Sequence, residues 1–228
     1  MRQLPLGVRI PDRAVFASFL PARNLEAVEH LKRVSCGEIS GNTWICGTSG
    51  IGKSHLLQAV CAAASETMRA GYFPFEPMAS LGIEALEGLP QLDCLCCDDL
   101  DQVAGQLDWE RALFGLMREL DERGARLVVS AASPPALLKW ALPDLGSRFG
   151  ASAIFQLRAL DELEQLQALQ LHAHVRGFEL PDDTARWLQR RYPRDMRTLY
   201  TLLDTLDEAA LVAQRRLTVP FIRTVLQD

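Results

Sequence analysis

The octapeptide GTSGIGKS, residues 47–54, constrains the fold of this 228-residue chain more than any other segment. It fits the phosphate-loop pattern G-x-x-x-x-G-K-S/T, with an apolar segment before it (residues 43–46) and a helix-like, Ala- and Leu-rich segment after it (residues 54–68). Glycines in such a loop let backbone N–H groups turn toward phosphate oxygens, at the positive end of the following helix. The pattern and its context predict a nucleotide-binding loop in an α/β domain.

The residues of the loop have separate expected roles. Lys53 is expected to reach the β- and γ-phosphates of the nucleotide, and Ser54 to hold Mg²⁺ through its hydroxyl group. The remaining loop residues that we expect to contact the nucleotide are Gly47, Thr48, Gly50, Ile51, Gly52 and His55.

A pair of acids follows a second apolar segment, residues 92–97. Asp98 is expected beside the metal, directly or through water, and Asp99 is expected to orient or deprotonate the attacking water. The alternative is that these acids only start a turn. Asp101 continues the acidic run, and we expect it to be simply solvated.

The same apolar segment contains a C-x-x-C pair, Cys94 and Cys97. Side chains three positions apart in a strand point to opposite faces, so these two thiols cannot bind one metal ion. We therefore interpret them as free thiols that act as small core residues in a reducing compartment.

Strand-like and helix-like segments alternate up to residue 157. Strands are expected at 43–46, 72–75, 92–97, 126–130 and 153–157, and helices at 24–34, 54–68, 81–86 and 109–120. Such alternation predicts a parallel five-stranded sheet with helices on both faces.

Helical signals dominate after residue 157. Asp161 and Glu164 form a plausible capping box for a helix that runs to about Arg176, and further helices are expected from Pro181, from Asp195 and near Thr218. The expected organisation is an N-terminal peptide (1–10), an α/β nucleotide-binding domain (11–159) and a small all-helical lid domain (160–228).

Charge and hydropathy exclude some classes of function. A net charge of −5 argues against a surface built mainly for nucleic-acid phosphates, so DNA contact is expected to be indirect or weak. No apolar run approaches the roughly 18 residues of a membrane span, and no signal-peptide core follows the first Arg. We expect a cytoplasmic protein.

Further segments carry a wider similarity: FASFLPARN, GTSGIGKSHLLQA, DDLDQVAG, SPPALL, LPDLGSRF, LQALQLHAHVRGFELPDD, RDMRTLYTLLDTLDEA and AQRRLTVPFI. In these segments, which span nearly the whole chain, the sequence resembles the AAA+ ATPases, and within them the DnaA-related group that includes the Hda-type regulators. The phosphate loop is shared by many NTPases, whereas the lid segments are more specific to this group.

The resemblance implies roles for residues outside the phosphate loop. Arg148 would be an arginine finger that enters the nucleotide site of a neighbouring subunit, and Arg197 would be the lid arginine that senses nucleotide in its own subunit. Leu20, Pro21 and Asn24 would line the adenine of ATP or ADP. The neighbour could be DnaA or, in a homodimer, a second copy of this chain.

The resemblance also implies a function. Proteins of this kind are negative regulators of DNA replication initiation: bound to ADP, and with the DNA-loaded sliding clamp, they stimulate hydrolysis of the ATP held by DnaA.

Two departures from the pattern matter. The sequence ends after the lid segments, so we do not expect the helix-turn-helix DNA-binding domain of the initiators. The second departure is in the segment VVSAASPP, where the family often has an acidic or amide side chain that senses the nucleotide. This chain has Ala131 and Ala132 in that region, which leaves Ser130 or Ser133 as weak substitutes. Slow hydrolysis of the chain's own ATP is expected.

The N-terminal stretch QLPLGV resembles the extended peptide by which bacterial proteins dock on the sliding clamp, the beta subunit of DNA polymerase III. Gln3, Leu4 and Leu6 match that peptide, and Pro5 favours an extended backbone. Gly7 stands where an aromatic residue or a second leucine is usual, so modest affinity is expected.

Two other functions compete with this one. A helicase-loader-like AAA+ ATPase would act with single-stranded DNA, but the acidic balance and the lack of a basic, aromatic-rich N-terminal extension weigh against it. A small-molecule kinase on a phosphate-loop fold would need a second substrate pocket, and the helical C-terminal third fits AAA+ better.

Overall fold

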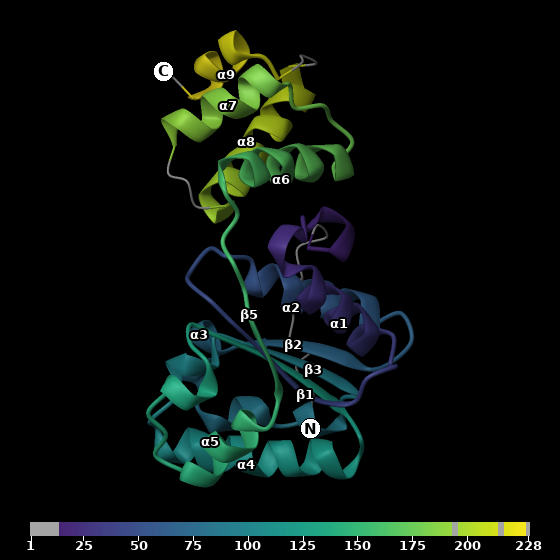
Figure 1. Cartoon of the computed structure of the whole chain (residues 1–228), viewed down its shortest axis with the longest axis vertical. Helices are drawn as coiled ribbons and strands as arrows, with labels where there is room; N and C mark the ends of the chain where they lie inside the picture. Colours follow the sequence, from purple (N-terminus) through teal and green to yellow (C-terminus); the bar gives the residue numbers. More distant parts are fainter. Residues whose placement is uncertain (1–13, 193–195, 214–216, 227–228) are drawn as a thin grey trace. The chain divides into compact units, whose positions relative to one another are not determined.

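The computed structural model describes residues 14–192, 196–213 and 217–226. Contacts within the chain divide it into two compact units (Figure 1). Of the described residues, the first unit contains 14–16, 25–48 and 53–157, and the second contains 17–24, 49–52 and those from 158 onward.

A five-stranded parallel sheet forms the centre of the first unit, and the predicted fold class is confirmed. The strands are β1 (Gly41–Cys46), β2 (Ala70–Pro74), β3 (Cys94–Asp98), β4 (Arg126–Ala131) and β5 (Ala153–Gln156). Their order is β2-β3-β4-β1-β5, with every neighbouring pair parallel. Parallel strands end at one common edge, here called the carboxyl edge, so the loop after β1 and the acids at the end of β3 lie on the same side.

Helices cover both faces of this sheet, with α1 and α2 on one face and α4 and α5 on the other (Figure 1). The helices of the first unit are α1 (Leu25–Ser35), α2 (Lys53–Ala64), α3 (Phe75–Met78), α4 (Leu107–Glu122) and α5 (Pro143–Gly150). The short helix expected at 81–86 is instead a pair of 3₁₀ turns, Ala79–Leu81 and Ile83–Leu86. Gly82 separates them with a φ of 83°, a value that an α-helix does not accommodate.

The cysteines behave as core residues. Cys46, Cys61, Cys94, Cys96 and Cys97 are buried free thiols, while Cys36 is exposed. Cys97 belongs to the core cluster that contains the buried side of α4, whereas Cys94 neighbours Cys61 of α2 on the other face of the sheet. The strand alternation that we used to separate Cys94 from Cys97 is therefore observed.

The second unit is built from helices and short 3₁₀ turns. Its α-helices are α6 (Glu162–Val175), α7 (Asp182–Arg191), α8 (Met196–Ala213) and α9 (Val219–Leu226). The predicted capping box is present, because the Asp161 carboxylate accepts the Glu164 N–H at 2.9 Å and the Glu164 carboxylate accepts the Asp161 N–H at 2.8 Å. Buried leucines of α6, α7 and α8 form its core together with Ile222 of α9. Within the described part of the chain, no helix has both the length and the apolar character needed to cross a bilayer.

Candidate nucleotide site

The phosphate loop depends on glycine at two described positions. Gly50 and Gly52 have φ values of 74° and 104°, in the left-handed region that other residues rarely adopt. A Cβ atom at Gly52 would also lie 2.7 Å from Cε2 of Phe19, a residue of the same unit. The backbone conformation and the available space therefore both require glycine at position 52.

Lys53 begins α2 with its side chain turned back over the start of the loop. Its Nζ donates hydrogen bonds to the carbonyl oxygens of Gly47 at 3.0 Å and Thr48 at 3.4 Å, and lies 4.0 Å from Oδ1 of Asp99. The residue is only 7% exposed. A buried ammonium group beside the first two loop residues is well placed for phosphate oxygens.

Ser54 and His55 occupy the first turn of α2. Nε2 of His55 donates a hydrogen bond to the carbonyl oxygen of Val15 at 3.1 Å, since a carbonyl can only accept. Burial lowers the pKa of His55 and favours its neutral form. This contact ties the segment at Val15 to α2.

Asp98, at the end of β3, is held at both carboxylate oxygens. Oδ2 accepts a hydrogen bond from the Tyr72 hydroxyl at 2.6 Å, and Oδ1 accepts one from the Ser130 hydroxyl. Ser130 also accepts the N–H of Asp99 at 3.0 Å. Its strand, β4, lies between β3 and β1. Of the two serines considered from the sequence, Ser130 is thus the one that contacts the acids.

Asp99 follows in an unusual backbone conformation, with a φ of 54° that aspartate tolerates better than most residues. Burial, and then the nearby Asp98 carboxylate, raises the pKa of Asp99 above its ordinary value. A raised pKa makes this carboxylate a better proton acceptor. The prediction that Asp101 is only solvated was wrong, because its Oδ1 accepts the Ala132 N–H at 3.2 Å.

The oxygen groups at this edge fit Mg²⁺. Magnesium prefers oxygen ligands and binds through one or two carboxylates together with substrate phosphates. Each oxygen of Asp98 has two lone pairs, and the hydrogen bonds from Tyr72 and Ser130 use one on each. Asp98 therefore keeps acceptor capacity for a metal ion or its water, and the hydroxyl of Ser54 is the second candidate ligand.

Arg148 lies on α5, a helix that the sequence pattern did not predict. Its Nη1 is 3.2 Å from Oδ2 of Asp121, and its guanidinium carbon is 4.8 Å from the ring centroid of Phe114. Asp121 belongs to the last turn of α4, just before β4 begins, so this arginine lies toward the opposite edge of the sheet from Lys53 and Asp98. The arginine side chain is 39% exposed. The first unit therefore does not bring Arg148 to its own acids and lysine.

Glu110 is a buried acid that sequence reasoning missed. Glu110 is 0% exposed. Its carboxylate accepts hydrogen bonds from the N–H groups of Gly105 at 2.6 Å, Ala141 at 3.2 Å and Leu142 at 2.5 Å. Leu142 is the N-cap residue of α5. Glu110 thus ties the loop after the acidic pair and the start of the Arg148 helix to α4. An acid between the apolar residues Trp109 and Leu113 was the available signal.

Replacing Glu110 with alanine should lower the free energy of unfolding by about 3 kcal/mol, because three part-buried N–H groups lose their shared acceptor at roughly 1 kcal/mol each. Thermal unfolding followed by circular dichroism measures this. Glu119→Ala is the control, since Glu119 is exposed on the same helix. A loss below about 1 kcal/mol for Glu110→Ala would contradict this assignment.

The predicted adenine-lining segment and lid arginine belong to the second unit. Nδ2 of Asn24 donates to the Arg158 carbonyl oxygen at 2.9 Å, and its Oδ1 accepts the Arg158 N–H at 2.7 Å. Leu20 and Pro21 are half-buried, and Arg197 is exposed in the first turn of α8. The Asn24 amide therefore holds the main chain where the lid segment begins.

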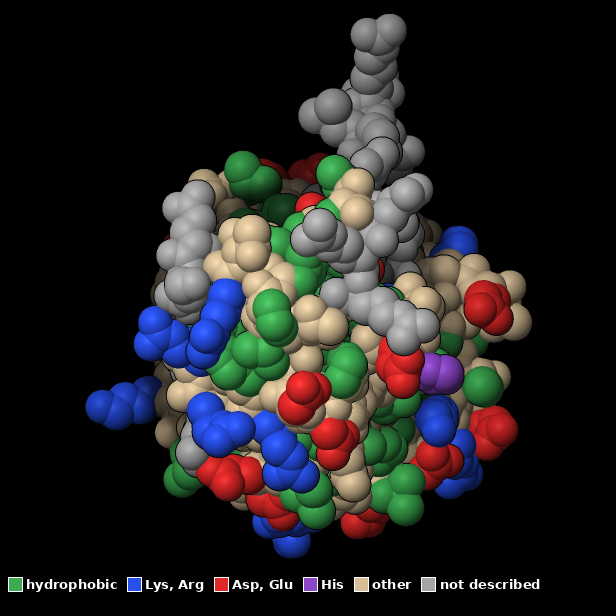
Figure 2. All heavy atoms as spheres, turned by 90° about the horizontal axis from the view of Figure 1, so that it is seen from above, with side chains coloured by type: hydrophobic (Ala, Val, Ile, Leu, Met, Phe, Trp, Pro, Cys, Tyr) green, Lys and Arg blue, Asp and Glu red, His purple; other side chains and the backbone are tan. Residues whose placement is uncertain are grey.

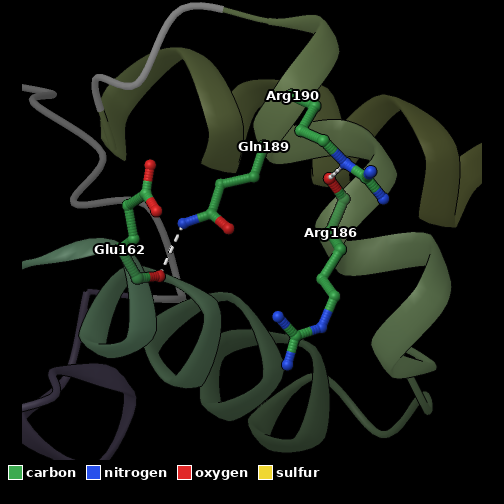
Figure 3. A pocket seen from close by; sticks show the side chains of 4 residues that line it. All are labelled: Glu162, Arg186, Gln189 and Arg190. Carbon is green, nitrogen blue, oxygen red and sulfur yellow. Dashed lines mark hydrogen bonds between the residues drawn. The ribbon is translucent and has the colours of Figure 1, made fainter.

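A separate hollow lies within the second unit (Figure 3). Glu162 of α6 and Arg186, Gln189 and Arg190 of α7 line this cavity of about 250 Å³. The Gln189 amide donates to the Glu162 carbonyl oxygen at 2.7 Å, and Nε of Arg190 donates to the Arg186 carbonyl oxygen at 3.2 Å.

On the face shown in Figure 2, described side chains of both charges are interspersed with apolar ones.

The clamp-binding residues predicted at the start of the chain, Gln3, Leu4 and Leu6, lie outside the described residues.

Two family models match the chain. Residues 13–156 match the bacterial DnaA ATPase domain, and residues 161–226 match the lid domain of Hda. Together these two matches cover both units of the fold.

Solved structures agree on the fold. Domain III of the replication initiation protein DnaA from Thermotoga maritima is 20% identical, with a TM-score of 0.80 over 96% of this chain and 97% of that chain. AMPPCP-bound DnaA from Aquifex aeolicus is 18% identical, with a TM-score of 0.70 over 87% of this chain and 66% of that chain. A DnaA bound to AMPPCP and single-stranded DNA is 18% identical, with a TM-score of 0.70 over 90% and 69%. With its DnaA-type core and its match to the Hda lid model, this chain belongs to the bacterial DnaA ATPase domain family of AAA+ proteins.

Proposed function

We propose that this chain binds ADP or ATP, together with Mg²⁺, through the phosphate loop and the acids at the carboxyl edge of its sheet. The buried ammonium of Lys53 and the oxygen groups of Ser54 and Asp98 support this proposal, as do the relatives whose structures contain AMPPCP. When bound, Mg²⁺ would neutralise charge on the phosphates. Arg197, Leu20 and Pro21 are the proposed contacts from the second unit.

The proposed biological role is negative regulation of replication initiation in the cytoplasm. Loaded with ADP and joined to the DNA-loaded sliding clamp, the chain stimulates hydrolysis of the ATP held by DnaA. The observation that carries this role is the position of Arg148, partly exposed and away from the acids of its own sheet, in a chain with a DnaA-type core and a match to the Hda lid.

In this role the arginine acts on a neighbouring subunit. The guanidinium of Arg148 leaves Asp121 and enters the nucleotide site of DnaA, where it stabilises negative charge that develops on the transferred phosphoryl group. Such arginines raise hydrolysis by about 10³–10⁵-fold in related systems. Phe114 and Asp121 hold the side chain until then.

The chain's own site is better suited to keep a nucleotide than to cleave it. Ser130 has a single hydroxyl proton and donates it to Asp98, so this proton is not available to a γ-phosphate or to the attacking water. Asp99 still provides a base, and hydrolysis is therefore slow rather than abolished.

The N-terminal segment 1–10 supplies the link to the sliding clamp in this proposal. Replacing Leu4 and Leu6 together with alanine should remove clamp binding, because a short extended peptide relies on a few apolar anchors. A pull-down with purified clamp measures this, with ADP binding as the check that the core is intact. Clamp binding equal to the wild type would rule out this segment as the link.

A reconstituted assay tests the proposed function as a whole. DnaA preloaded with labelled ATP is freed of excess nucleotide and mixed with the ADP-loaded chain, clamp and DNA, with each component omitted in turn. Conversion to ADP that needs all components supports the regulator role. If this chain alone hydrolysed ATP faster in the presence of single-stranded DNA, the result would instead support a helicase-loader-like ATPase. That function is the second candidate, because one similar structure is a DnaA bound to single-stranded DNA.

A further inference from the structure

Tyr72 lies beside the carboxylate of Asp98, and none of the sequence motifs includes it. It belongs to β2, at the edge of the sheet, and pairs with Cys96 of β3. Because strand side chains alternate, Tyr72, Cys96 and Asp98 share one face, the face covered by α2. The Tyr72 hydroxyl donates to Oδ2 of Asp98 at 2.6 Å, and the side chain of Gln58 on α2 lies near the same hydroxyl.

We propose that Tyr72 is a positioning residue, which orients the Asp98 carboxylate for Mg²⁺ and so sets how strongly Mg²⁺ tightens nucleotide binding. This inference rests on the proposed nucleotide site and adds a residue to it. Tyr72 acts through Asp98 and makes no contact with the nucleotide itself.

The geometry explains how a tyrosine at the sheet edge can do this. The terminal torsion of an aspartate side chain is broad, so an unrestrained carboxylate rotates. Here Ser130 holds one oxygen and Tyr72 the other, which fixes the plane of the carboxylate. A hydrogen bond to a charged oxygen at 2.6 Å is among the stronger kinds.

The hydrogen-bond capacity of the hydroxyl separates this role from direct nucleotide binding. The single proton of the Tyr72 hydroxyl is donated to Asp98. Removing the hydroxyl therefore changes the orientation of Asp98 and leaves the phosphate loop and Lys53 untouched. Partners that orient metal-binding carboxylates typically contribute about 10–100-fold to metal affinity.

Calorimetric titration of the full chain with ADP, once with excess MgCl₂ and once with EDTA, tests the inference. The quantity compared is the ratio of the two Kd values. Tyr72→Phe is expected to reduce the Mg²⁺-dependent gain in affinity by about tenfold, and to leave the Kd in EDTA unchanged.

Tyr200→Phe is the matched control, because it removes a tyrosine hydroxyl from α8, outside the sheet. Its ratio should equal that of the wild type. An unchanged ratio in Tyr72→Phe, or equal weakening in both buffers, would overturn the positioning role while leaving the nucleotide site in place. A wild-type chain that binds no ADP in either buffer would overturn the proposed nucleotide site as well.

Discussion

The Arg148→Ala variant is expected to lose about 10³-fold of the stimulated hydrolysis of DnaA-bound ATP, while it binds ADP as tightly as the wild type. Hydrolysis falls because the guanidinium would no longer stabilise charge in the DnaA site. ADP binding is retained because Arg148 lies toward the opposite edge of the sheet from Lys53 and Asp98. The single-turnover rate of ATP preloaded on DnaA measures the first quantity, and calorimetry measures the second.

Two further variants separate this role from a general loss of charge. Arg148→Lys keeps the positive charge but not the planar, multi-donor group, so only partial recovery is expected. Arg33→Ala is the matched control, because Arg33 is an exposed arginine of α1 in an ion pair of similar length, 3.1 Å, with Glu38. Full stimulation by Arg148→Ala would show that another group acts in the DnaA site.

Lys53→Ala is expected to weaken ADP binding about 100-fold, which corresponds to roughly 3 kcal/mol. Lys53 is 7% exposed and lies over the start of the phosphate loop, so its charge meets the phosphates with little competition from water. Calorimetric titration with ADP measures the change. The stimulated hydrolysis of DnaA-bound ATP should also decrease at ADP concentrations that do not saturate the variant.

Lys32→Ala serves as the control for Lys53→Ala. The Lys32 side chain, on α1, is 44% exposed and pairs with Glu29 at 2.8 Å, and its removal should leave ADP affinity unchanged. An ADP affinity for Lys53→Ala within about twofold of the wild type would contradict the position assigned to the phosphates.

Much of the fold follows from local patterns in the sequence. The phosphate loop predicted its own strand and helix, because only glycine accommodates the backbone at Gly50 and Gly52. The apolar runs with turn signals between them predicted a parallel sheet, since strands buried on both faces read as continuous apolar segments. The capping box at Asp161 fixed the start of α6.

What the sequence did not predict depends on contacts between distant residues. Tyr72 and Asp98 are 26 positions apart, and Glu110 and Leu142 are 32 apart, so no local pattern links them. Helix α5 spans only eight residues and contains two glycines, which leaves too little periodicity to detect. The direction in which Arg148 points is likewise a property of the assembled α4 and α5.

The central claim is that hydrolysis takes place in the DnaA site and not in the site of this chain. Two reconstituted mixtures with DNA-loaded clamp decide it: in one, labelled ATP is preloaded on DnaA, and in the other it is preloaded on this chain, with unlabelled nucleotide on the partner. The proposed function predicts rapid conversion to ADP of the label that starts on DnaA, and slow conversion of the label that starts on this chain. Rapid conversion of the label on this chain, with the label on DnaA intact, would contradict it.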